Sequence, residues 1–400
     1  MDLFEKCYQF SRAKEIIAAG VLPYFLTVQE NHGPLVKMEG RDVIMAGSND
    51  YLGLSQHPEV IEAACQAAKE FGSSCSGSRF LNGTTTLHTR LEEELADFLG
   101  TEACLAFTTG YLTNQGVIQT LVQRNEYLIS DKENHASIVA GSLIAKALGA
   151  NVLRYGTNDM ADLEATLKTI PIDAPKLIVT DGVFSMTGRI VDLPKIVELA
   201  RRYKARVMID EAHAVGVLGE DGQGTCAHFG LKNGSDVELT MGTFSKSFAS
   251  LGGFIAGERS VIDYIKFNSQ AFRFSASMSP ASVGAVRASL RIIRREPERV
   301  ARLLEISRQV REGVKSHGFK IIEGITPIIP IIIGDDMATF GAWKRLLDNG
   351  VFVNAVIAPG VPQGQQLLRV SLIATYKQEH VDKIVEMIGK VGKELGLIGG

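Results

Sequence analysis

A single lysine stands among hydroxyl groups and glycines in the stretch Thr240–Gly253, which reads TMGTFSKSFASLGG. The residues before it, Asp236–Thr240, are typical of a short strand, and a turn is expected at Gly242. A lysine that is desolvated beside polar donors can acquire a lowered pKa and form a Schiff base with a carbonyl compound. Lys246 is therefore a candidate for covalent chemistry, although the same pattern also fits a solvated surface lysine.

Further polar residues follow the ends of other predicted strands. They are Asp210 and His213 after strand 205–210, Ser185 after 177–181, His135 after 127–130, and Thr109–Tyr111 after 103–107 at a helix start. In open α/β sheets, ligands bind beyond the carboxyl ends of the strands, and free amides at a helix start suit a phosphate. Each residue alone also fits a structural role, such as a helix cap or a hydrogen-bonded core histidine. Together, a lysine, an acid, two histidines and a phosphate site match the needs of pyridoxal 5′-phosphate (PLP).

The predicted elements explain how these residues come together. Strands and helices alternate regularly from residue 59 onwards, which predicts a mostly parallel central sheet covered by helices on both faces. The elements expected outside this region are a helix over 2–19, strands at 35–39 and 43–46, a long helix over about 279–317, strands at 319–322, 328–333, 351–355 and 367–372, and a last helix from Gln378. The sequence predicts an α/β fold in three parts: an N-terminal arm (1–50), a large cofactor-binding domain (51–278) and a small α+β domain (279–400).

The composition argues against several classes of protein. With 45% hydrophobic and 22% charged residues, the 400-residue chain is expected to fold, and its net charge of −3 offers no basic surface for nucleic acid. Its five cysteines form no CxxC or Cys–His pattern, so no metal site and a reducing compartment are expected. No signal peptide is recognised, and no apolar run approaches the roughly 18 residues that span a bilayer. A cytoplasmic location is expected, with peripheral contact of the N-terminal helix at the inner face of the membrane left open.

Five motifs carry a resemblance to a known family. They are Gly47–Gly53 (GSNDYLG), Gly77–Thr84 (GSRFLNGT), Asn134–Ser137 (NHAS), Asp210–His213 (DEAH) and Gly242–Lys246 (GTFSK). Over nearly all of its length the chain resembles the α-oxoamine synthases, which are PLP-dependent enzymes of fold type I. Within that family, the GTFSK and SRFLNGT segments are most similar to those of bacterial soluble serine palmitoyltransferases. The resemblance implies PLP as cofactor and a homodimer with a shared active site.

The same resemblance implies a role for each candidate residue. The cofactor would be held by Lys246 as a Schiff base, by Asp210 at its pyridine nitrogen, by His213 and Ser185 at its phenolic oxygen, by His135 on its ring face, and by Gly110, Tyr111, Thr243 and Ser245. Ser275 and Ala276 would reach the phosphate bound by the partner subunit. Substrate contacts would come from Asn49, Tyr51, Arg79, His135 and Arg369. Catalysis would involve Lys246, His135, Asp210 and His213.

The implied reaction is a decarboxylative condensation of L-serine with palmitoyl-CoA, which yields 3-oxosphinganine, CoA and CO2 in the first step of sphingolipid synthesis. One alternative is another member of the family that uses glycine or alanine, either 2-amino-3-ketobutyrate CoA ligase or 8-amino-7-oxononanoate synthase. More remote alternatives are an aminotransferase and a non-catalytic PLP-binding protein on the same fold.

Overall fold

The computed structural model describes residues 2–18 and 20–398, which form two compact units. The larger unit is Asn49–Leu304. The smaller unit combines the described residues of Met1–Ser48 with those of Glu305–Gly400. The N-terminal arm and the C-terminal part of the chain, which were expected to be separate, therefore belong to the same unit.

The boundary between the units differs from the predicted one at residue 279. Helix α12 (Pro280–Arg295) packs against α3 (Pro58–Phe71), and both belong to the larger unit. The buried face of α12 carries Val283, Val286 and Leu290 among others, so this helix covers the larger unit instead of starting a new one. Sequence composition changes at residue 279, whereas packing changes about one helix later.

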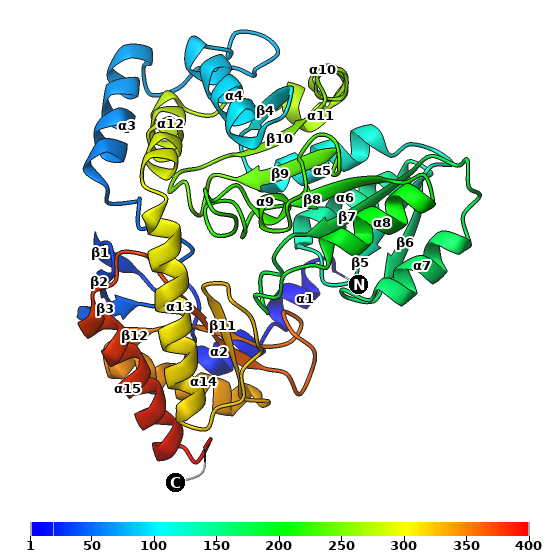
Figure 1. The fold of residues 1–400 in the computed structure, drawn as a ribbon. Coiled ribbons are helices and arrows are strands. Elements are labelled where there is room, and N and C mark those ends of the chain that lie inside the picture. Colours follow the sequence, from blue (N-terminus) through cyan, green and yellow to red (C-terminus); the bar gives the residue numbers. More distant parts are fainter. Residues whose placement is uncertain (1, 19, 399–400) are drawn as a thin grey trace. The chain divides into compact units, whose positions relative to one another are not determined.

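A seven-stranded sheet forms the centre of the larger unit (Figure 1). Its strands are β4 (Ala103–Phe107), β5 (Tyr127–Asp131), β6 (Asn151–Tyr155), β7 (Lys176–Asp181), β8 (Arg206–Asp210), β9 (Leu239–Thr243) and β10 (Gly253–Gly257). Their order is β4-β10-β9-β8-β7-β5-β6. The pairs from β9 to β6 are parallel, and β10 runs antiparallel to both of its neighbours. The prediction of a mostly parallel sheet is confirmed.

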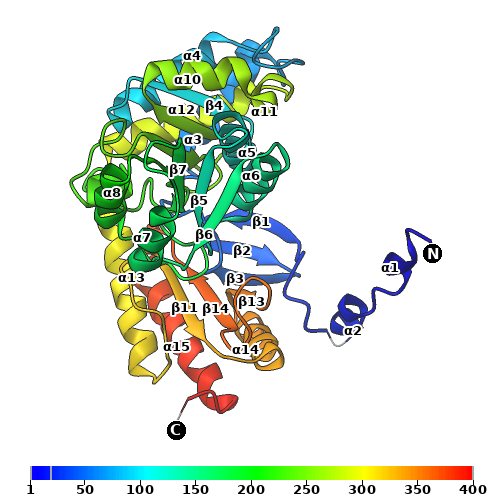
Figure 2. The ribbon, with the colours of Figure 1, turned by 90° about the vertical axis from the view of Figure 1, so that its right-hand side faces the viewer.

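Helices cover both faces of this sheet (Figure 2). Besides α3 and α12 they are α4 (Thr86–Leu99), α5 (Gly110–Leu121), α6 (Ala136–Ala147), α7 (Met160–Lys168), α8 (Leu193–Arg202), α9 (Thr225–His228), α10 (Arg259–Asn268) and α11 (Gln270–Arg273). Figure 2 shows α5 and α6 on one side of strands β5 to β7, and α7 and α8 on the other.

Strand residues alternate between two hydrophobic cores that lie under these helices. On β7, Val179 belongs to the core that includes residues of α5 and α6, whereas Ile178 belongs to the core that includes residues of α7 and α8. On β8, Met208 and Ile209 divide in the same way. Both faces of the strands are buried, which is why these strands read as continuous apolar runs and only their ends are free to carry polar residues.

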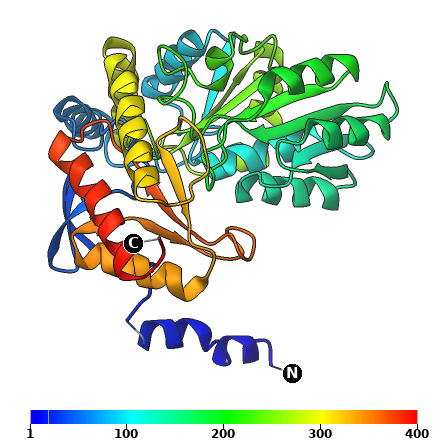
Figure 3. The ribbon, with the colours of Figure 1, turned by 60° about the horizontal axis from the view of Figure 1, so that its bottom comes forward.

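The smaller unit contains two short sheets, ordered β1-β2-β3-β12 and β11-β14-β13. The strands are β1 (Val28–His32), β2 (Leu35–Met38), β3 (Arg41–Met45), β11 (Ile328–Ile332), β12 (Val351–Phe352), β13 (Asn354–Val356) and β14 (Leu367–Ser371). Its C-terminal helices are α14 (Asp336–Asp348), in orange in Figure 3, and α15 (Gln378–Glu394), in red. The predicted α+β character of this part is therefore present.

The single N-terminal helix predicted over 2–19 is wrong. The described residues form two short helices, α1 (Glu5–Tyr8) and α2 (Arg12–Ala18), while residue 19 lies outside the described residues. The apolar side chains of Leu3, Phe4 and Tyr8 are exposed and so gain no tertiary packing. Helices this short are marginal in water without such packing, so amphipathic spacing alone does not produce one long helix.

Two other predicted elements are interrupted. The long helix over 279–317 ends at Arg295, and α13 (Glu298–Ser316) begins just after Pro297. Proline removes a backbone donor and clashes with the preceding turn, so it starts helices and does not continue them. The strand predicted at 319–322 is reduced to one bridge between Ile321 and Ile331, and the one at 351–355 divides into β12 and β13 of different sheets. Among the described residues, every helix is too short or too polar to cross a membrane.

Candidate active site

The predicted cofactor residues gather around one cavity of about 250 Å³ in the larger unit. It lies where β7, β8 and β9 end and where α5 and α6 begin. The predicted site residues that line it are Gly110, Tyr111, His135, Asp210, His213, Thr243, Ser245 and Lys246. An amine, a carboxylate and two imidazoles, which come from three separate parts of the sequence, therefore face the same space.

Parallel pairing places acidic residues side by side at this edge of the sheet. Asp181, the last residue of β7, is the register partner of Asp210, the last residue of β8. Asp210 is in turn the partner of Met241 on β9, and β9 ends two residues later at Thr243. The loop that carries Lys246 therefore leaves the sheet from the same edge as both carboxylates.

Lys246 lies on the loop between β9 and β10, and Thr243 holds the two ends of this loop together. The Thr243 hydroxyl donates to the carbonyl of Gly252 over 3.0 Å and lies 3.0 Å from the Ser245 hydroxyl. These contacts join the first and last residues of the loop. Thr243 and Ser245 thus shape the loop in addition to lining the cavity, where the resemblance assigns them to the cofactor.

Two glycines allow close packing around this loop. Gly242 lies inside β9 opposite Phe254, so the turn predicted there is wrong, and a Cβ at this position would come within 2.4 Å of the Phe254 ring. Gly110 begins α5, and a Cβ there would lie 2.8 Å from Thr243 Oγ1. Thr109 caps the helix through its side-chain oxygen. The start of α5 therefore brings backbone N–H groups against the cavity, as an anion site requires.

Asp210 is only 4% exposed, and both of its carboxylate oxygens accept hydrogen bonds. Oδ1 accepts from the backbone N–H of Ala212 over 2.9 Å, and Oδ2 accepts from Nδ2 of Asn114 over 2.7 Å. The same Asn114 amide donates to Ser137 Oγ over 2.9 Å, and Ser137 Oγ lies 2.7 Å from Nδ1 of His135. A continuous chain of hydrogen bonds therefore joins the acid to the histidine.

The cavity favours the neutral forms of two of its titratable groups. Burial and then the charge of Asp210 raise the pKa of Asp181 well above its usual range. Desolvation and the charge of Lys246 lower the pKa of His135, while Asp210 opposes that shift. The backbone N–H of Ser137 donates to Nδ1 of His135 over 3.3 Å, which places the proton of the neutral ring on Nε2.

His213 is buried, and Tyr51 contacts the Nδ1 side of its ring. The Tyr51 hydroxyl lies 2.6 Å from His213 Nδ1 and 3.2 Å from Asn49 Oδ1. The single hydroxyl hydrogen of Tyr51 is donated to Asn49 Oδ1, so the Tyr51 oxygen can accept from a proton on His213 Nδ1. Tyr51 itself is 0% exposed and its hydroxyl contacts the histidine, while its predicted contact with the substrate stays a prediction.

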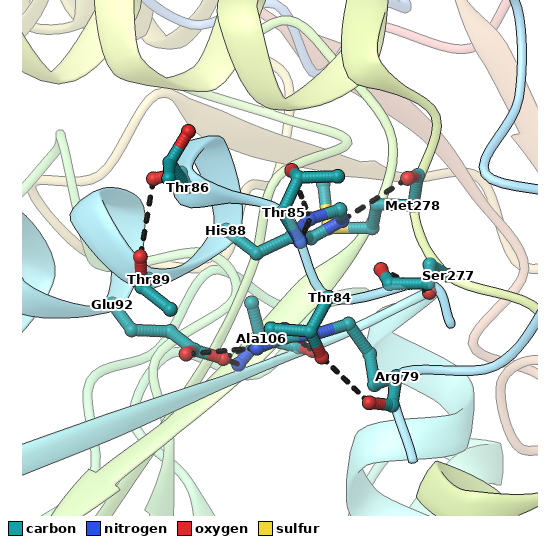
Figure 4. Close-up of polar contacts among 11 residues, drawn as sticks. Arg79, Thr84, Thr85, Thr86, His88, Thr89, Glu92, Ala106, Ser277 and Met278 are labelled. Carbon is teal, nitrogen blue, oxygen red and sulfur yellow. Dashed lines mark hydrogen bonds and ion pairs between the residues drawn. The ribbon is translucent and has the colours of Figure 1, made fainter. Parts of the chain in front are cut away.

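Arg79 was also predicted to bind substrate, and the structure places it in a buried ion pair (Figure 4). Its two terminal nitrogens donate to the two carboxylate oxygens of Glu92 over 2.8 and 3.0 Å, and its Nε donates to Thr84 Oγ1 over 3.1 Å. The Arg79 side chain is 4% exposed and that of Glu92 is 12% exposed. This pairing gives Arg79 a structural role in the GSRFLNGT motif, and its predicted contact with a substrate stays a prediction.

Three further predicted cofactor residues lie outside the lining of the cavity. Ser185 is half-buried in the segment after β7, which a bridge between Val183 and Ile190 closes. Ser275 is half-buried, and Ala276 is exposed and pairs with Ser78. The roles predicted for Ser185, and for Ser275 and Ala276 toward a partner subunit, stay predictions.

Arg369 lies on β14 of the smaller unit and is 5% exposed. One of its terminal nitrogens donates to Ser371 Oγ over 2.5 Å. Its predicted contact with the substrate carboxylate stays a prediction, as does that of Asn49, which is half-buried in the larger unit.

Sequence reasoning missed Asn114, Ser137 and Asp181, all of which line the cavity. One signal was available for Asn114, because it stands one helical turn after Gly110 and so projects from the same face of α5. Asp181 ends a predicted strand beside the strand that ends in Asp210, and strand order would have indicated it. Ser137 ends the NHAS motif, but the motif gave it no role, because its importance comes from the two side chains that it touches.

The chain matches the family model for class I and II aminotransferases over residues 41–388. It is 44% identical over 98% of its length to serine palmitoyltransferase of Sphingobacterium spiritivorum, 97% of which is covered. It is 42% identical over 91% of its length to 8-amino-7-oxononanoate synthase of Lysinibacillus sphaericus, with 92% of that protein covered. A solved structure of serine palmitoyltransferase with its PLP internal aldimine superposes with a TM-score of 0.96 at 32% identity, and each chain is covered completely.

These matches confirm the family predicted from the sequence motifs and the fold type that it implies. The family model covers the sheet, the lysine loop and most of the smaller unit, and the relatives extend over nearly the whole chain. The chain belongs to the class I and II aminotransferase family, and along its full length it is similar to serine palmitoyltransferase.

Proposed function

We propose that this protein is a PLP-dependent acyltransferase that condenses L-serine with a long-chain acyl-CoA, with loss of CO2 and CoA, to give 3-oxosphinganine from palmitoyl-CoA. The observation that carries the proposal is the single cavity in which Lys246, Asp210 and His135 meet the start of α5. The full-length similarity to serine palmitoyltransferase gives that chemistry its substrates.

The donor set of the cavity fits PLP. Gly110 brings the first amides of α5 against the cavity wall, where a larger residue would collide with Thr243, and such amides suit the phosphate. Asp210 offers a buried carboxylate whose two oxygens are both acceptors, as a protonated pyridine nitrogen requires. Lys246 offers the primary amine that would attach the aldehyde carbon of the cofactor. When bound, PLP supplies an electron sink that stabilises negative charge on the α-carbon of an amino acid.

The residues of the chain would carry the proton transfers and the orientation of the substrate. Lys246, once the substrate amine has taken its place, would be the base that removes the α-proton and later returns a proton to the same carbon. His135 would direct its Nε2–H toward the substrate carboxylate, because Nδ1 is occupied by Ser137. His213 would contact the phenolic oxygen through Nε2 while the Tyr51 hydroxyl holds Nδ1 at 2.6 Å. The burial of Asp210 would keep competing water away from the ring nitrogen.

A second candidate is an 8-amino-7-oxononanoate synthase, since the relative of that activity is nearly as similar as the serine palmitoyltransferase. The two activities share the lysine, the acid and the histidines, and they differ in amino acid and acyl chain. We favour serine because the serine palmitoyltransferase match covers more of this chain, 98% against 91%.

The test is CoA release from purified enzyme with serine, glycine or alanine, each combined with short-chain and long-chain acyl-CoA. We expect the highest kcat/KM for serine with palmitoyl-CoA. Lys246→Ala should abolish turnover with every pair, and retained turnover would contradict the role of Lys246. A clear preference for alanine with a short acyl-CoA would instead select the second candidate.

The proposal includes a homodimer whose partner subunit contributes Ser275 and Ala276, as the family resemblance implies. Both residues lie outside the lining of the cavity in their own chain, which is consistent with use by another copy. Sedimentation equilibrium should give the mass of two chains. A Lys246→Ala subunit mixed with a Ser275→Asp subunit should recover activity in the hybrid if the site is shared, and no recovery would contradict sharing.

A further inference from the structure

Asn114 is a buried asparagine with an unusual distribution of hydrogen bonds. It is 0% exposed, and the two hydrogens of its amide go to two different groups of the cavity, Asp210 Oδ2 and Ser137 Oγ. Among the described residues, its own carbonyl oxygen Oδ1 is buried and finds no hydrogen-bond partner. A buried acceptor without a partner destabilises the fold, so the two hydrogen bonds that Asn114 Nδ2 donates must offset this free energy.

The neighbours of Asn114 determine which way its amide faces. If the amide turned over, Oδ1 would stand about 2.7 Å from Asp210 Oδ2, which already behaves as an acceptor. Two acceptors at that distance repel one another, so the observed orientation suits an ionised Asp210 and the reversed one suits a protonated Asp210. The amide therefore favours the charged form of Asp210 and fixes the position of one carboxylate oxygen.

The second amide hydrogen of Asn114 influences which nitrogen of His135 carries the proton. Ser137 Oγ accepts from Asn114, so the Ser137 hydroxyl hydrogen is left to point toward His135 Nδ1 at 2.7 Å. Together with the backbone N–H of Ser137, 3.3 Å from Nδ1, this chain of donors from Asn114 through Ser137 makes Nδ1 the acceptor. One side chain orients both the acid and the histidine of the cavity.

We propose that Asn114 is a positioning residue for the cofactor site, which holds Asp210 charged with one amide hydrogen and sets the tautomer of His135 through Ser137 with the other. The inference rests on the proposed binding of PLP but not on the choice of amino acid or acyl-CoA. It concerns the protonation of two stated atoms, the pyridine nitrogen next to Asp210 and Nδ1 of His135.

The first test uses PLP labelled with ¹⁵N at the pyridine nitrogen, whose chemical shift reports protonation without any turnover. Asp210→Ala provides the reference for the unprotonated nitrogen. In Asn114→Leu, which keeps the bulk and removes both donors, we expect the signal to move from the wild-type position toward that reference and PLP to bind about 10- to 100-fold more weakly. An unchanged signal and affinity would overturn the inference.

Asn134→Leu is the matched control. Asn134 is also buried at this edge of the sheet, and it bonds to Ser130 Oγ and to the backbone of Val179 and Asp181. Its loss should lower thermal stability as much as the loss of Asn114 and leave the pyridine signal at the wild-type position. An equal shift in both variants would show a general structural effect and overturn the specific role of Asn114.

A second variant keeps the inference testable if Asn114→Leu does not fold. Asn114→Asp has the same size, and its carboxylate would share a proton with Asp210, so the pyridine signal should again move toward the unprotonated reference. If wild-type protein binds no PLP at all, the proposed function fails. If it binds PLP and both Asn114 variants match it, only the inference about Asn114 fails.

The His135 branch is tested in the cofactor-free protein with ¹⁵N-labelled histidine. The chain has eight histidines, and the His135→Gln spectrum identifies the signals of His135. Wild-type protein should show Nδ1 of His135 as the unprotonated nitrogen. Ser137→Ala removes the hydroxyl contact of 2.7 Å and leaves only the longer backbone N–H contact of 3.3 Å, so the ring signals should move toward a mixture of tautomers. A protonated Nδ1 in the wild type, or identical spectra of the two proteins, would overturn this branch.

Discussion

Substitution of Arg79 tests whether this residue stabilises the fold through its ion pair with Glu92 or binds a substrate. Its bidentate pair with Glu92 is almost wholly buried, and Glu92 Oε1 also accepts from the backbone N–H of Ala106 over 2.9 Å. In Arg79→Met, the carboxylate of Glu92 loses its cation and keeps this one bond. Removing one partner of a buried pair typically costs about 3–5 kcal/mol, because the other charge stays buried without compensation.

That loss is large enough to measure in two ways. We expect the free energy of unfolding in urea to fall by about 3–5 kcal/mol. Unfolding entropy of about 2.1 cal/mol/K per residue over 400 residues gives about 0.8 kcal/mol/K, so a loss of about 4 kcal/mol lowers Tm by about 5 °C. The double variant Arg79→Met with Glu92→Met should recover most of the stability, because two apolar side chains then replace the whole pair.

The kinetics separate this role from substrate binding. If Arg79 is structural, the double variant regains both its stability and the wild-type KM values. The structural role of Arg79 would be refuted if Arg79→Met kept its stability but had a higher KM for one substrate. In that case the double variant would not recover the wild-type KM. The exposed pair of Arg202 with Glu198 on α8 is the control, because breaking a solvated pair should change stability far less.

Three further predictions follow from the site. Burial raises the pKa of Glu211 from 4.5 to about 7, so the native protein binds the extra proton and wild-type stability should fall by about 3 kcal/mol as pH rises from about 4.5 to about 7. Glu211→Gln lacks this titration. Between pH 4.5 and pH 7, the free energy of unfolding in urea of Glu211→Gln should therefore rise relative to that of the wild type. Gly110→Ala places a Cβ against Thr243 and should weaken PLP binding by about tenfold or more, measured by cofactor titration. Tyr51→Phe removes the hydroxyl that lies 2.6 Å from His213 Nδ1 and should lower kcat with little change in KM, measured by CoA release.

Each of these predictions has a control or a contradictory outcome. Equal pH dependence of unfolding in wild type and Glu211→Gln would show that the Glu211 carboxyl does not titrate in this window. For the glycine, Gly341→Ala on α14 is matched, because a Cβ there meets nothing within 4 Å and PLP affinity should not change. For the tyrosine, a rise in the KM for serine at unchanged kcat would instead support direct substrate binding by Tyr51.

The chemistry of the site could be predicted from the sequence because each reactive residue follows a strand. Buried parallel strands read as short apolar runs, and the polar residue after each run must lie at one edge of the sheet. Asp210, His135 and Lys246 were identified in this way, and the structure brings all three to one cavity. The mostly parallel sheet followed from the same alternation of elements.

Tertiary structure alone decided how the side chains are used. Sequence motifs assigned Tyr51 and Arg79 to the substrate, and the folded chain also places Tyr51 against His213 and Arg79 against Glu92. The link from Asp210 to His135 depends on Asn114 of helix α5, which precedes both residues in the sequence, and on the parallel register, and neither appears in a linear motif. Residue type and strand position determine which chemistry is possible, whereas hydrogen-bond direction depends on three-dimensional neighbours that only the folded chain supplies.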